Sequence, residues 1–429
     1  ANDTAVVYLF AHNNNDGGFG ESGDQDVIKC GSYTGTASSG NFVSLGFEPQ
    51  WLLIKRSSGT EDWMLFDNMR GVATGGTDQD LRPNKSNAEG STQDWLDFNA
   101  TGFTLNTTLV NVNGSGSTYI YMAIRRGGMQ TPTAATDVFA LQQDDAGGTE
   151  PAFVSGFPVD AAFSRNATGT AVNFFGSRLT GANYLRTNAN NAETSNSDFE
   201  WDYMNGWNSE PAQGSSVISY MWKRARGYFD VVAYTGTGNN RTISHNLGVV
   251  PEMMWVKLRN STEYFQVYHK DFLATEYIEF RTNGKTSSNG TLRWNSTRPT
   301  DSVFSLGTHS SVNGSSNTYI AYLFATVANV SKVGSYTMQS GGIDVDCGFS
   351  AGARFILIKS TESGRDWLVF DTTRGIVAGN DPYLRINLTD PEVTSQDLVD
   401  PLSSGFRIPQ SGVGNIANIG ETYIFYAIA

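Results

Sequence analysis

A short aromatic and β-branched stretch recurs along the chain and constrains the fold more than any other feature. It reads TYIYMAI at 118–124, TYIAYLF at 318–324 and TYIFYAI at 422–428, with a divergent copy, SVISYMW, at 216–222. Such runs, most of them entered from turns rich in Gly, Ser and Asn, are typical of strands rather than helices. The copies are spaced by about one hundred residues or a multiple of that length. This repeat is too long for a solenoid and has the size of a small domain.

Other motifs recur around this stretch and divide the chain into four tandem repeats. We place repeat 1 at 27–127, repeat 2 at 128–226, repeat 3 at 227–328 and repeat 4 at 329–429. Repeats 1 and 4 match motif by motif, from Gly-Ser-Tyr-Thr near the start to Gly-Phe before the closing strand. Repeat 3 keeps most of these motifs, and repeat 2 is the most divergent. The chain is therefore predicted to be a tandem array of about four domains of roughly 100 residues each.

Composition and turn content predict an all-β fold. Aromatic residues make up 12% of the chain and charged residues only 17%, and Gly is abundant. Apolar runs of strand length are separated by Gly, Pro, Asn and Ser, and no segment shows a sustained apolar stripe at the helical period. Many of the runs alternate only partly, which suits packing between two sheets. We therefore expect each repeat to be a β-sandwich, jelly-roll-like in topology, with helices short or absent.

The first residues of the chain resemble the end of a repeat. VVYLFA at 6–11 matches IAYLFA at 320–325, which closes repeat 3. Residues 1–26 are therefore predicted to be the last strand of a preceding unit plus a polar loop, in a chain that continues a longer polypeptide. The alternative is that this strand completes the first domain.

The polar loop near the N-terminus contains candidate calcium ligands. Asp16, Asp24 and Asp26 lie among Asn and Gly residues, and oxygen-rich loops of this kind can hold calcium. Their spacing fits no EF-hand, and Asn, Asp and Gly are also ordinary turn residues. No metal is therefore assigned, and no cofactor is expected.

Charge and hydropathy limit the classes of partner. The net charge is −13 and the longest basic run is the pair Arg125-Arg126, whereas phosphate binding needs clustered Lys and Arg. Nucleic acid is therefore not an expected partner. The chain contains nothing close to eighteen consecutive apolar residues, so no membrane-spanning helix is expected.

One arginine motif is present in every repeat. Leu/Phe-Arg-x-Asn occurs four times, with its arginine at Arg82, Arg186, Arg281 and Arg385. Repeats 1 and 4 also contain an Asp and an Arg three residues apart after an aromatic strand, a pattern that predicts a bidentate ion pair between strand and loop. The arginines could bind a ligand, but a feature kept in every copy is more simply a feature of the fold. We interpret them as structural.

The stretch DFEWDY at 198–203, followed by Trp207, is the most enzyme-like part of the sequence. In a strand its carboxylates share one face and its aromatic rings the other, and neighbours on one face are about 7 Å apart. Inverting glycosidases use carboxylates at such a spacing, but an outward-facing row offers no burial to keep one of them protonated. Two other interpretations are a solvated acidic face over an aromatic core, and glycan binding by Trp201, Trp207, Glu200 and Asp202.

No residue is assigned a catalytic role. The four histidines show no metal-ligand spacing, and the chain contains no nucleophile motif, phosphate loop or Cys/His pair. The protein is therefore expected not to be an enzyme.

Several motifs of the repeats resemble a known family. They are GSYTG at 31–35, LGFEPQWLLIKR at 45–56, NAE at 87–89 and TYIY at 118–121. Together they resemble an uncharacterised tandem-repeat domain of marine phage virion proteins, described as tail-fibre-like or structural. The resemblance covers essentially the whole chain, and it departs from the family in repeat 2 and at Tyr268-His269. That family has no established activity, so the resemblance implies a context rather than a mechanism.

The resemblance implies a non-enzymatic phage virion appendage protein, such as a tail fibre, located on the virion and therefore extracellular. Its expected partners are other virion proteins and a host surface glycan or receptor, and homo-oligomerisation is expected. One alternative is a purely structural capsid-decoration or fibre-forming protein. The other is a glycan depolymerase that uses Glu200 and Asp202 as its carboxylate pair.

Overall fold

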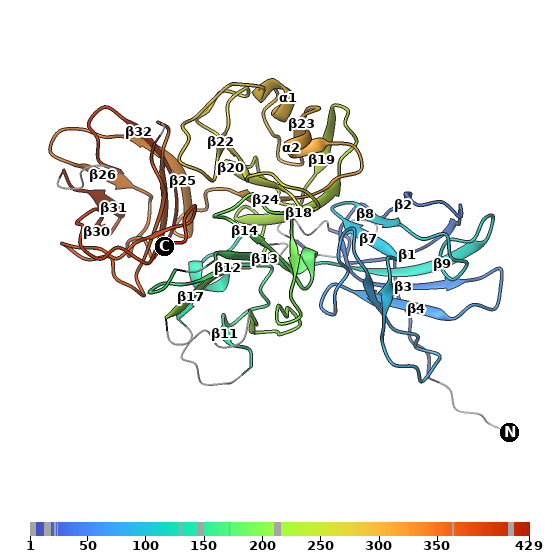
Figure 1. Ribbon diagram of the computed structural model, residues 1–429. Helices are drawn as coiled ribbons and strands as arrows, with labels where there is room; N and C mark the ends of the chain where they lie inside the picture. Colours follow the sequence, from blue (N-terminus) through green and yellow to red (C-terminus); the bar gives the residue numbers. More distant parts are fainter. Residues whose placement is uncertain are drawn as a thin grey trace. The chain divides into compact units, whose positions relative to one another are not determined.

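The computed structural model describes residues 6–12, 19–20, 23, 25–127, 130–143, 150–170, 172–209, 216–362, 364–410 and 416–429. The predicted all-β class is confirmed, because the regular structure is almost entirely antiparallel strand (Figure 1). The helices in the described residues are single turns: η1 (Ala135–Asp137), η2 (Arg178–Thr180), α1 (Gly290–Trp294) and α2 (Ser310–Asn313). The chain divides into two compact units, Ala1–Gln130 (unit 1) and Thr131–Ala429 (unit 2).

Unit 1 is a sandwich of two antiparallel sheets. Its main sheet has the order β1 (Ile28–Thr34), β9 (Thr118–Arg125), β3 (Pro49–Arg56) and β4 (Trp63–Asp67). Its second sheet has the order β2 (Asn41–Ser44), β8 (Gly102–Leu105) and β7 (Leu96–Asn99), and β5 (Asp78–Asp80) pairs with β6 (Gly90–Gln93). The core between the two sheets is filled by fully buried side chains such as Leu52, Phe66, Phe103 and Tyr119.

Unit 2 contains three main sheets of the same kind. The first has the order β10 (Phe139–Gln143), β17 (Val217–Trp222), β12 (Ala161–Asn166), β13 (Phe174–Ser177), β14 (Asn183–Arg186) and β15 (Thr194–Ser195). The second has the order β18 (Phe229–Thr235), β24 (Thr318–Phe324), β20 (Met253–Leu258), β21 (Gln266–His269) and β22 (Ile278–Glu279). The third has the order β25 (Ser331–Thr337), β32 (Thr422–Ile428), β27 (Phe355–Ser360), β28 (Trp367–Asp371) and β29 (Leu384–Arg385).

Each main sheet of unit 2 is accompanied by a smaller one. These are β11 (Phe153–Val154) with β16 (Gly206–Trp207), β19 (Arg241–Ser244) with β23 (Val303–Leu306), and the order β26 (Ile343–Asp346), β31 (Gly405–Ile408) and β30 (Asp400–Leu402). Separate apolar clusters fill the space between main and small sheets. The sandwich architecture expected for a repeat is therefore present in this unit too.

The recurring stretch is the second strand in the order of every main sheet. In β9, β17, β24 and β32 it pairs with the first strand of its repeat on one side and with the third on the other. The register of the next hairpin is also the same in each sheet, because Trp51 pairs with Asp67 as Phe355 pairs with Asp371. The sequence repeats thus coincide with a repeated strand order. The predicted boundaries between repeats stay predictions.

The main sheets of unit 2 are apolar on both faces. In β24, Tyr319, Ala321 and Leu323 face the core of their own sandwich, whereas Ile320 and Tyr322 face a second cluster. Every residue of β24 after the first is buried. A strand covered on both faces favours a continuous apolar run, which explains why this stretch alternates so little.

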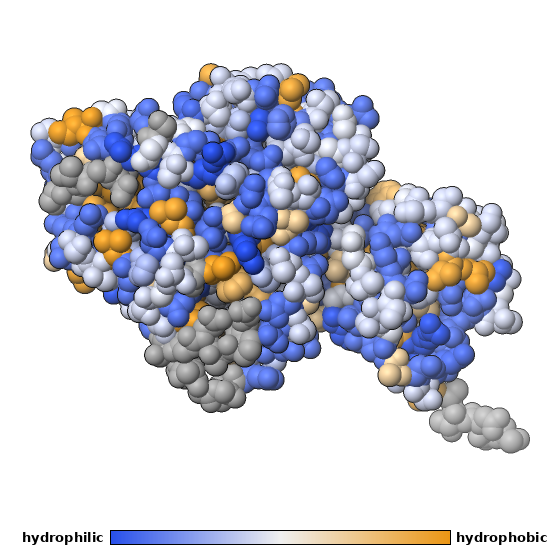
Figure 2. Space-filling model, in the orientation of Figure 1, coloured by the Kyte–Doolittle hydropathy of each residue, from blue (hydrophilic) through white to orange (hydrophobic). Residues whose placement is uncertain are grey.

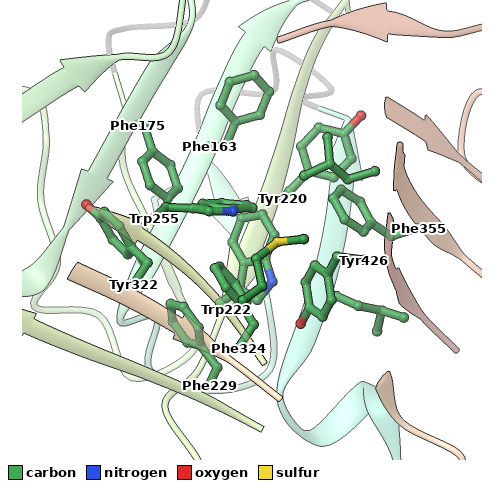
Figure 3. Close-up of a cluster of buried hydrophobic side chains, with 14 of the residues drawn as sticks. Phe163, Phe175, Tyr220, Trp222, Phe229, Trp255, Tyr322, Phe324, Phe355 and Tyr426 are labelled. Carbon is green, nitrogen blue, oxygen red and sulfur yellow. The ribbon is translucent and has the colours of Figure 1, made fainter. Parts of the chain in front are cut away.

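The second cluster is shared by the three main sheets of unit 2, and we call it the shared core. Its largest side chains point toward one another in Figure 3: Phe163, Phe175, Tyr220, Trp222, Phe229, Trp255, Tyr322, Phe324, Phe355 and Tyr426. Ring pairs join each sheet to both of the others, with centroid distances of 4.5 Å for Phe175–Tyr322, 4.8 Å for Phe324–Tyr426 and 5.3 Å for Tyr220–Phe355. The three sheets therefore enclose a single aromatic core.

The described residues before β1 form no strand. Residues 6–12 are irregular, and Val6, Tyr8 and Leu9 are highly exposed. They do not complete the main sheet of unit 1, whose described order begins at β1. Their predicted origin as the last strand of a preceding unit stays a prediction.

Candidate functional site

The two tryptophans of the acidic and aromatic stretch are buried. Trp201 is 5% exposed and Trp207 is fully buried, and their rings stack at 4.9 Å within the core beneath the first main sheet of unit 2. Glycan binding by these tryptophans needs exposed rings, whereas both rings complete the core of their own sandwich. The interpretation of glycan binding by Trp201 and Trp207 therefore has no exposed aromatic surface to support it.

The carboxylates of this stretch face outward. Glu200 and Asp202 are exposed while Phe199 and Trp201 are buried, although the segment forms only a single bridge, between Glu200 and Asn208, and no strand. The predicted alternation of burial is present without the predicted strand. The arrangement matches the interpretation of a solvated acidic face over an aromatic core.

Glu200 is held by neutral hydrogen-bond donors. Its Oε2 atom accepts from Nδ2 of Asn208 at 2.8 Å and lies 3.0 Å from the Tyr203 hydroxyl, which is also 3.1 Å from Oε2 of Glu150. Desolvation, followed by these two carboxylates, raises the pKa of the Tyr203 phenol. These contacts turn Glu200 toward Tyr203 and Asn208 and not toward Asp202, so the residues named for glycan cleavage do not converge here.

The candidate calcium ligands fall mostly outside the described part of the chain. Asp16 and Asp24 lie outside it, whereas Asp26 is described and its backbone carbonyl accepts from Arg125. Among the described residues, no group of three or more Asp, Glu, His or Cys side chains is arranged to hold a metal ion. The calcium assignment stays a prediction.

The four repeat arginines contact groups of their own repeats. Arg82 lies 3.6 Å from Asp62, and Arg385 lies 3.4 Å from Asp366. Arg186 donates to the Tyr184 hydroxyl. Arg281 lies over the Tyr264 ring at 4.7 Å. Such contacts fix the segment around the fifth strand of each repeat and agree with the structural interpretation.

The ion pairs predicted after the fourth strand are present in repeats 1 and 4. Nε of Arg70 donates to Oδ2 of Asp67 at 2.7 Å, and Nε of Arg374 donates to Oδ2 of Asp371 at 2.6 Å. The second pair has an additional partner, because the Tyr220 hydroxyl donates to Oδ2 of Asp371 at 2.7 Å. Through this contact the pair in repeat 4 also anchors repeat 2, and it is fully buried.

The loops that carry the repeat arginines cross to a neighbouring sheet in unit 2. The same backbone hydrogen bond occurs three times, each at 2.7 Å. The donors and acceptors are Glu193 N–H and Arg259 O, Lys285 N–H and Thr361 O, and Glu392 N–H and Ala167 O. The loop of repeat 2 thus contacts repeat 3, that of repeat 3 contacts repeat 4, and that of repeat 4 contacts repeat 2. The three loops close a ring around the shared core, and we call these contacts the loop ring.

Each acceptor of the loop ring lies two residues after a buried cation. Nζ of Lys257 donates to the carbonyls of Asn191 and Leu258 at 2.9 and 2.8 Å, and burial lowers the pKa of Lys257 to about 8. Arg165 donates to the carbonyl of Arg385 at 3.0 Å, and burial lowers the pKa of Arg165 to about 10. A buried cation is tolerated when carbonyl groups replace its water. Here those carbonyls include atoms of the neighbouring repeat.

Sequence reasoning missed the loop ring and its cations. Its signal was a basic residue at one position of every third strand: Lys55, Arg165, Lys257 and Lys359. The motif Asn-Ala-Glu, present in repeats 1 and 2, was a second signal. Arg165 and Lys257 contribute to contacts between repeats, which a single repeat examined alone does not reveal. Lys55 and Lys359 instead donate to carbonyls of their own hairpins.

No helix in the described ranges is long and apolar enough to span a membrane. This agrees with the expectation from hydropathy.

The comparisons with known proteins identify a family without assigning a function. The model of a domain of unknown function, DUF7483, matches residues 4–126 and 161–429. The unmatched stretch between these ranges lies mostly at the start of repeat 2, the most divergent repeat. No protein of curated function matches the chain.

Proposed function

The chain belongs to the DUF7483 family, since that family model matches most of its length. We propose that the protein is a non-enzymatic structural component of a phage particle, in a tail fibre or a similar appendage, which is the context that the resemblance of its repeat motifs implies. Its role is to build a rigid assembly of β-sandwiches that contacts neighbouring particle proteins.

The observation that carries this proposal is the shared core. Three sandwiches bury both faces of their main sheets, and the ring pairs that join them come from all three. Apolar and aromatic surface that could line a binding groove is instead used to fix one sandwich against the next. Such packing suits a load-bearing scaffold better than a site that must admit a substrate.

The surface and the motifs support the same role. Figure 2 shows a face covered largely by hydrophilic residues, with hydrophobic residues in small separate patches. A net charge of −13 keeps such a surface soluble and disfavours binding to nucleic acid. The motifs that resemble virion proteins lie in the strands and loops that build the sandwiches. Their resemblance is what supports a location on a phage particle.

The proposal is tested on particles. Phage particles would be purified from a culture that carries the gene, and the chain would be sought by mass spectrometry and located with gold-labelled antibodies. Label at an appendage is the expected result. Recovery of the chain only from the particle-free fraction would refute the proposal.

An enzymatic role is tested in parallel with the Glu200→Gln variant. Reducing ends released from host surface polysaccharide would be measured for the variant and the unmodified chain. We expect no release above background for either protein. Release that depends on Glu200 would replace the structural proposal with the depolymerase.

A further inference from the structure

The outer face of the main sheet in unit 1, the face that points away from its own core, is apolar but only partly covered. Nine large apolar side chains lie on this face, beside Cys30, Ser32, Lys55 and Asp67: Ile28, Trp51, Leu53, Trp63, Leu65, Leu81, Ile120, Met122 and Ile124. These apolar side chains are all half-buried except Ile120, which is 43% exposed. A β-sheet face with this much apolar surface is typical of an interaction site.

The equivalent positions of unit 2 are buried. Ile320 and Ile424, which occupy the position of Ile120, have exposures of 0% and 1%. Leu357, at the position of Leu53, is 1% exposed. These side chains belong to the shared core, where each main sheet is covered by the two others. The face that unit 1 leaves partly open is therefore the face that unit 2 uses to join its three sheets.

Unit 1 also contains both halves of the loop-ring contact. Glu89 is the counterpart of Glu193, whose N–H donates across the ring, and Ser57 is the counterpart of Arg259, whose carbonyl accepts. In the described part of unit 1, neither the Glu89 N–H nor the Ser57 carbonyl takes a backbone partner. Residues 83–89 are all exposed. The Glu89 N–H and the Ser57 carbonyl are thus available, at two separate places on one sandwich, for hydrogen bonds to a partner.

The cation of the loop ring is present as well. Lys55 occupies the position of Lys257, and Asn87 occupies that of Asn191, whose carbonyl accepts from Lys257 at 2.9 Å. In unit 1 Lys55 instead donates to the carbonyls of Glu61 and Gly59 in its own hairpin. Lys55 can therefore exchange a local carbonyl for one on a neighbour, as its counterpart in repeat 3 has done.

The geometry of unit 2 determines what fits this surface. Its three donor loops and three acceptor hairpins are all used by one another, so this ring is complete within repeats 2, 3 and 4. A partner must therefore supply a further copy of the same face, donor and acceptor. A head-to-tail contact of this kind forms a closed ring when its rotation closes, and in unit 2 it closes after three sheets.

We infer that unit 1 binds the unit 1 sandwiches of two further copies of this chain, through the outer face of its main sheet, to form a homotrimer. The trimer repeats between chains the arrangement that repeats 2, 3 and 4 form within one chain. Glu89 of each copy donates to Ser57 of the next, and the Ile120 side chains become buried in a new apolar core, as Ile320 and Ile424 are buried in unit 2. This inference does not depend on where the protein acts.

Sedimentation of the full chain provides the first test. One copy has a mass of 46.6 kDa, and we expect a species of three times that mass. The Ile120→Glu variant should sediment as single copies with an unchanged far-UV circular dichroism spectrum, since Ile120 is exposed in the single copy. Phe42→Glu is the matched control, because Phe42 is 49% exposed on the small sheet of the same sandwich and should leave the trimer intact.

Three outcomes of this test would refute the inference. The first is a chain that remains a single copy at concentrations of tens of micromolar. The second is a dimer, and the third is a trimer that Ile120→Glu and Phe42→Glu affect equally. A single-copy result would leave the proposed location on a phage particle to the labelling experiment, so the two proposals can fail separately.

A cross-link tests the ring itself. Ser57→Cys and Glu89→Cys would be combined in a chain that also carries Cys30→Ser and Cys347→Ala, which remove the native thiols. We expect oxidation to give a ladder that ends at three linked chains, because a backbone hydrogen bond of 2.7 Å from Glu193 N–H to the Arg259 carbonyl brings the main chains together at the equivalent positions. The chain with Glu89→Cys alone on the same background should not form the three-chain product. A ladder that continues beyond three chains, or the absence of cross-links, would refute the closed ring.

Discussion

Repeats 1 and 4 share their motifs and strand order, yet their main sheets have different surroundings. In repeat 4 both faces are covered, one by its own small sheet and the other by the shared core. In repeat 1 only the inner face is covered completely. Strand order is therefore set within one repeat, whereas burial of the outer face depends on neighbours. The same sheet can be an internal element of a scaffold or a surface for association.

The largest expected effect of this difference concerns one leucine. Leu357→Ala in the shared core should destabilise unit 2 by about 2–5 kcal/mol, because it leaves a cavity between three sheets. Leu53→Ala at the equivalent, half-buried position should cost about 1–2 kcal/mol, since less apolar area is lost there. Both would be measured by denaturant unfolding at a concentration where the chain sediments as single copies. Equal effects would contradict the difference in burial.

The ion pair after the fourth strand should show a contrast of similar size. Asp371→Asn removes a fully buried carboxylate that holds both Arg374 and Tyr220, and it should cost about 3–5 kcal/mol. Asp67→Asn acts on a partly exposed pair and should cost about 1 kcal/mol or less.

Thermal unfolding of the Asp371→Asn and Asp67→Asn variants would give the two values, with circular dichroism as the control for folding. If Asp67→Asn were the more damaging substitution, the assignment of Asp371 as an anchor between repeats would be wrong.

A further expected effect depends on pH. His269 occupies in repeat 3 the position of Asp67, and burial lowers the pKa of its imidazole to about 4. The unfolded chain binds this proton at a higher pH than the folded chain does. The stability that depends on a neutral His269 is therefore present above about pH 6.5 and is lost as the pH falls toward 4.

The His269→Gln variant isolates this contribution. The difference in unfolding free energy between unmodified and variant chains should shrink as the pH falls from about 6.5 to about 4. Asp271, which lies 3.8 Å from the ring, is kept in both proteins. A difference that stays constant with pH would show that His269 does not change its charge on unfolding in this range.

Much of the fold could be predicted from the sequence, because it follows from local patterns. The recurring stretch TYIYMAI indicated a strand in each repeat, and turn residues indicated many short strands, which is the observed class. The Asp-Arg pairs were predictable as well, since both partners lie within one loop. Contacts between residues only three positions apart can be predicted from the sequence.

The missed features depend on contacts over long distances in the chain. Ring pairs such as Tyr220–Phe355 join residues far apart in sequence, and no periodicity indicates them. The same limit applies at Trp201 and Trp207, for which the sequence left open both an aromatic core and a glycan-binding surface. The structure places both rings beneath their own sheet. A strand that is apolar at every position, as in 318–324, was the available signal that both faces are covered.

The central claim is that three sheets of unit 2 share one core, and hydrogen exchange tests it most directly. Phe355→Ala alters one ring on β27, a ring that contacts Trp222 and Tyr426. Amide exchange of the full chain would be measured for the variant and the unmodified protein. A shared core predicts faster exchange in β17 and β24 as well as in β27, with β9 of unit 1 unchanged. Faster exchange confined to β27 and its own sheet would contradict the account.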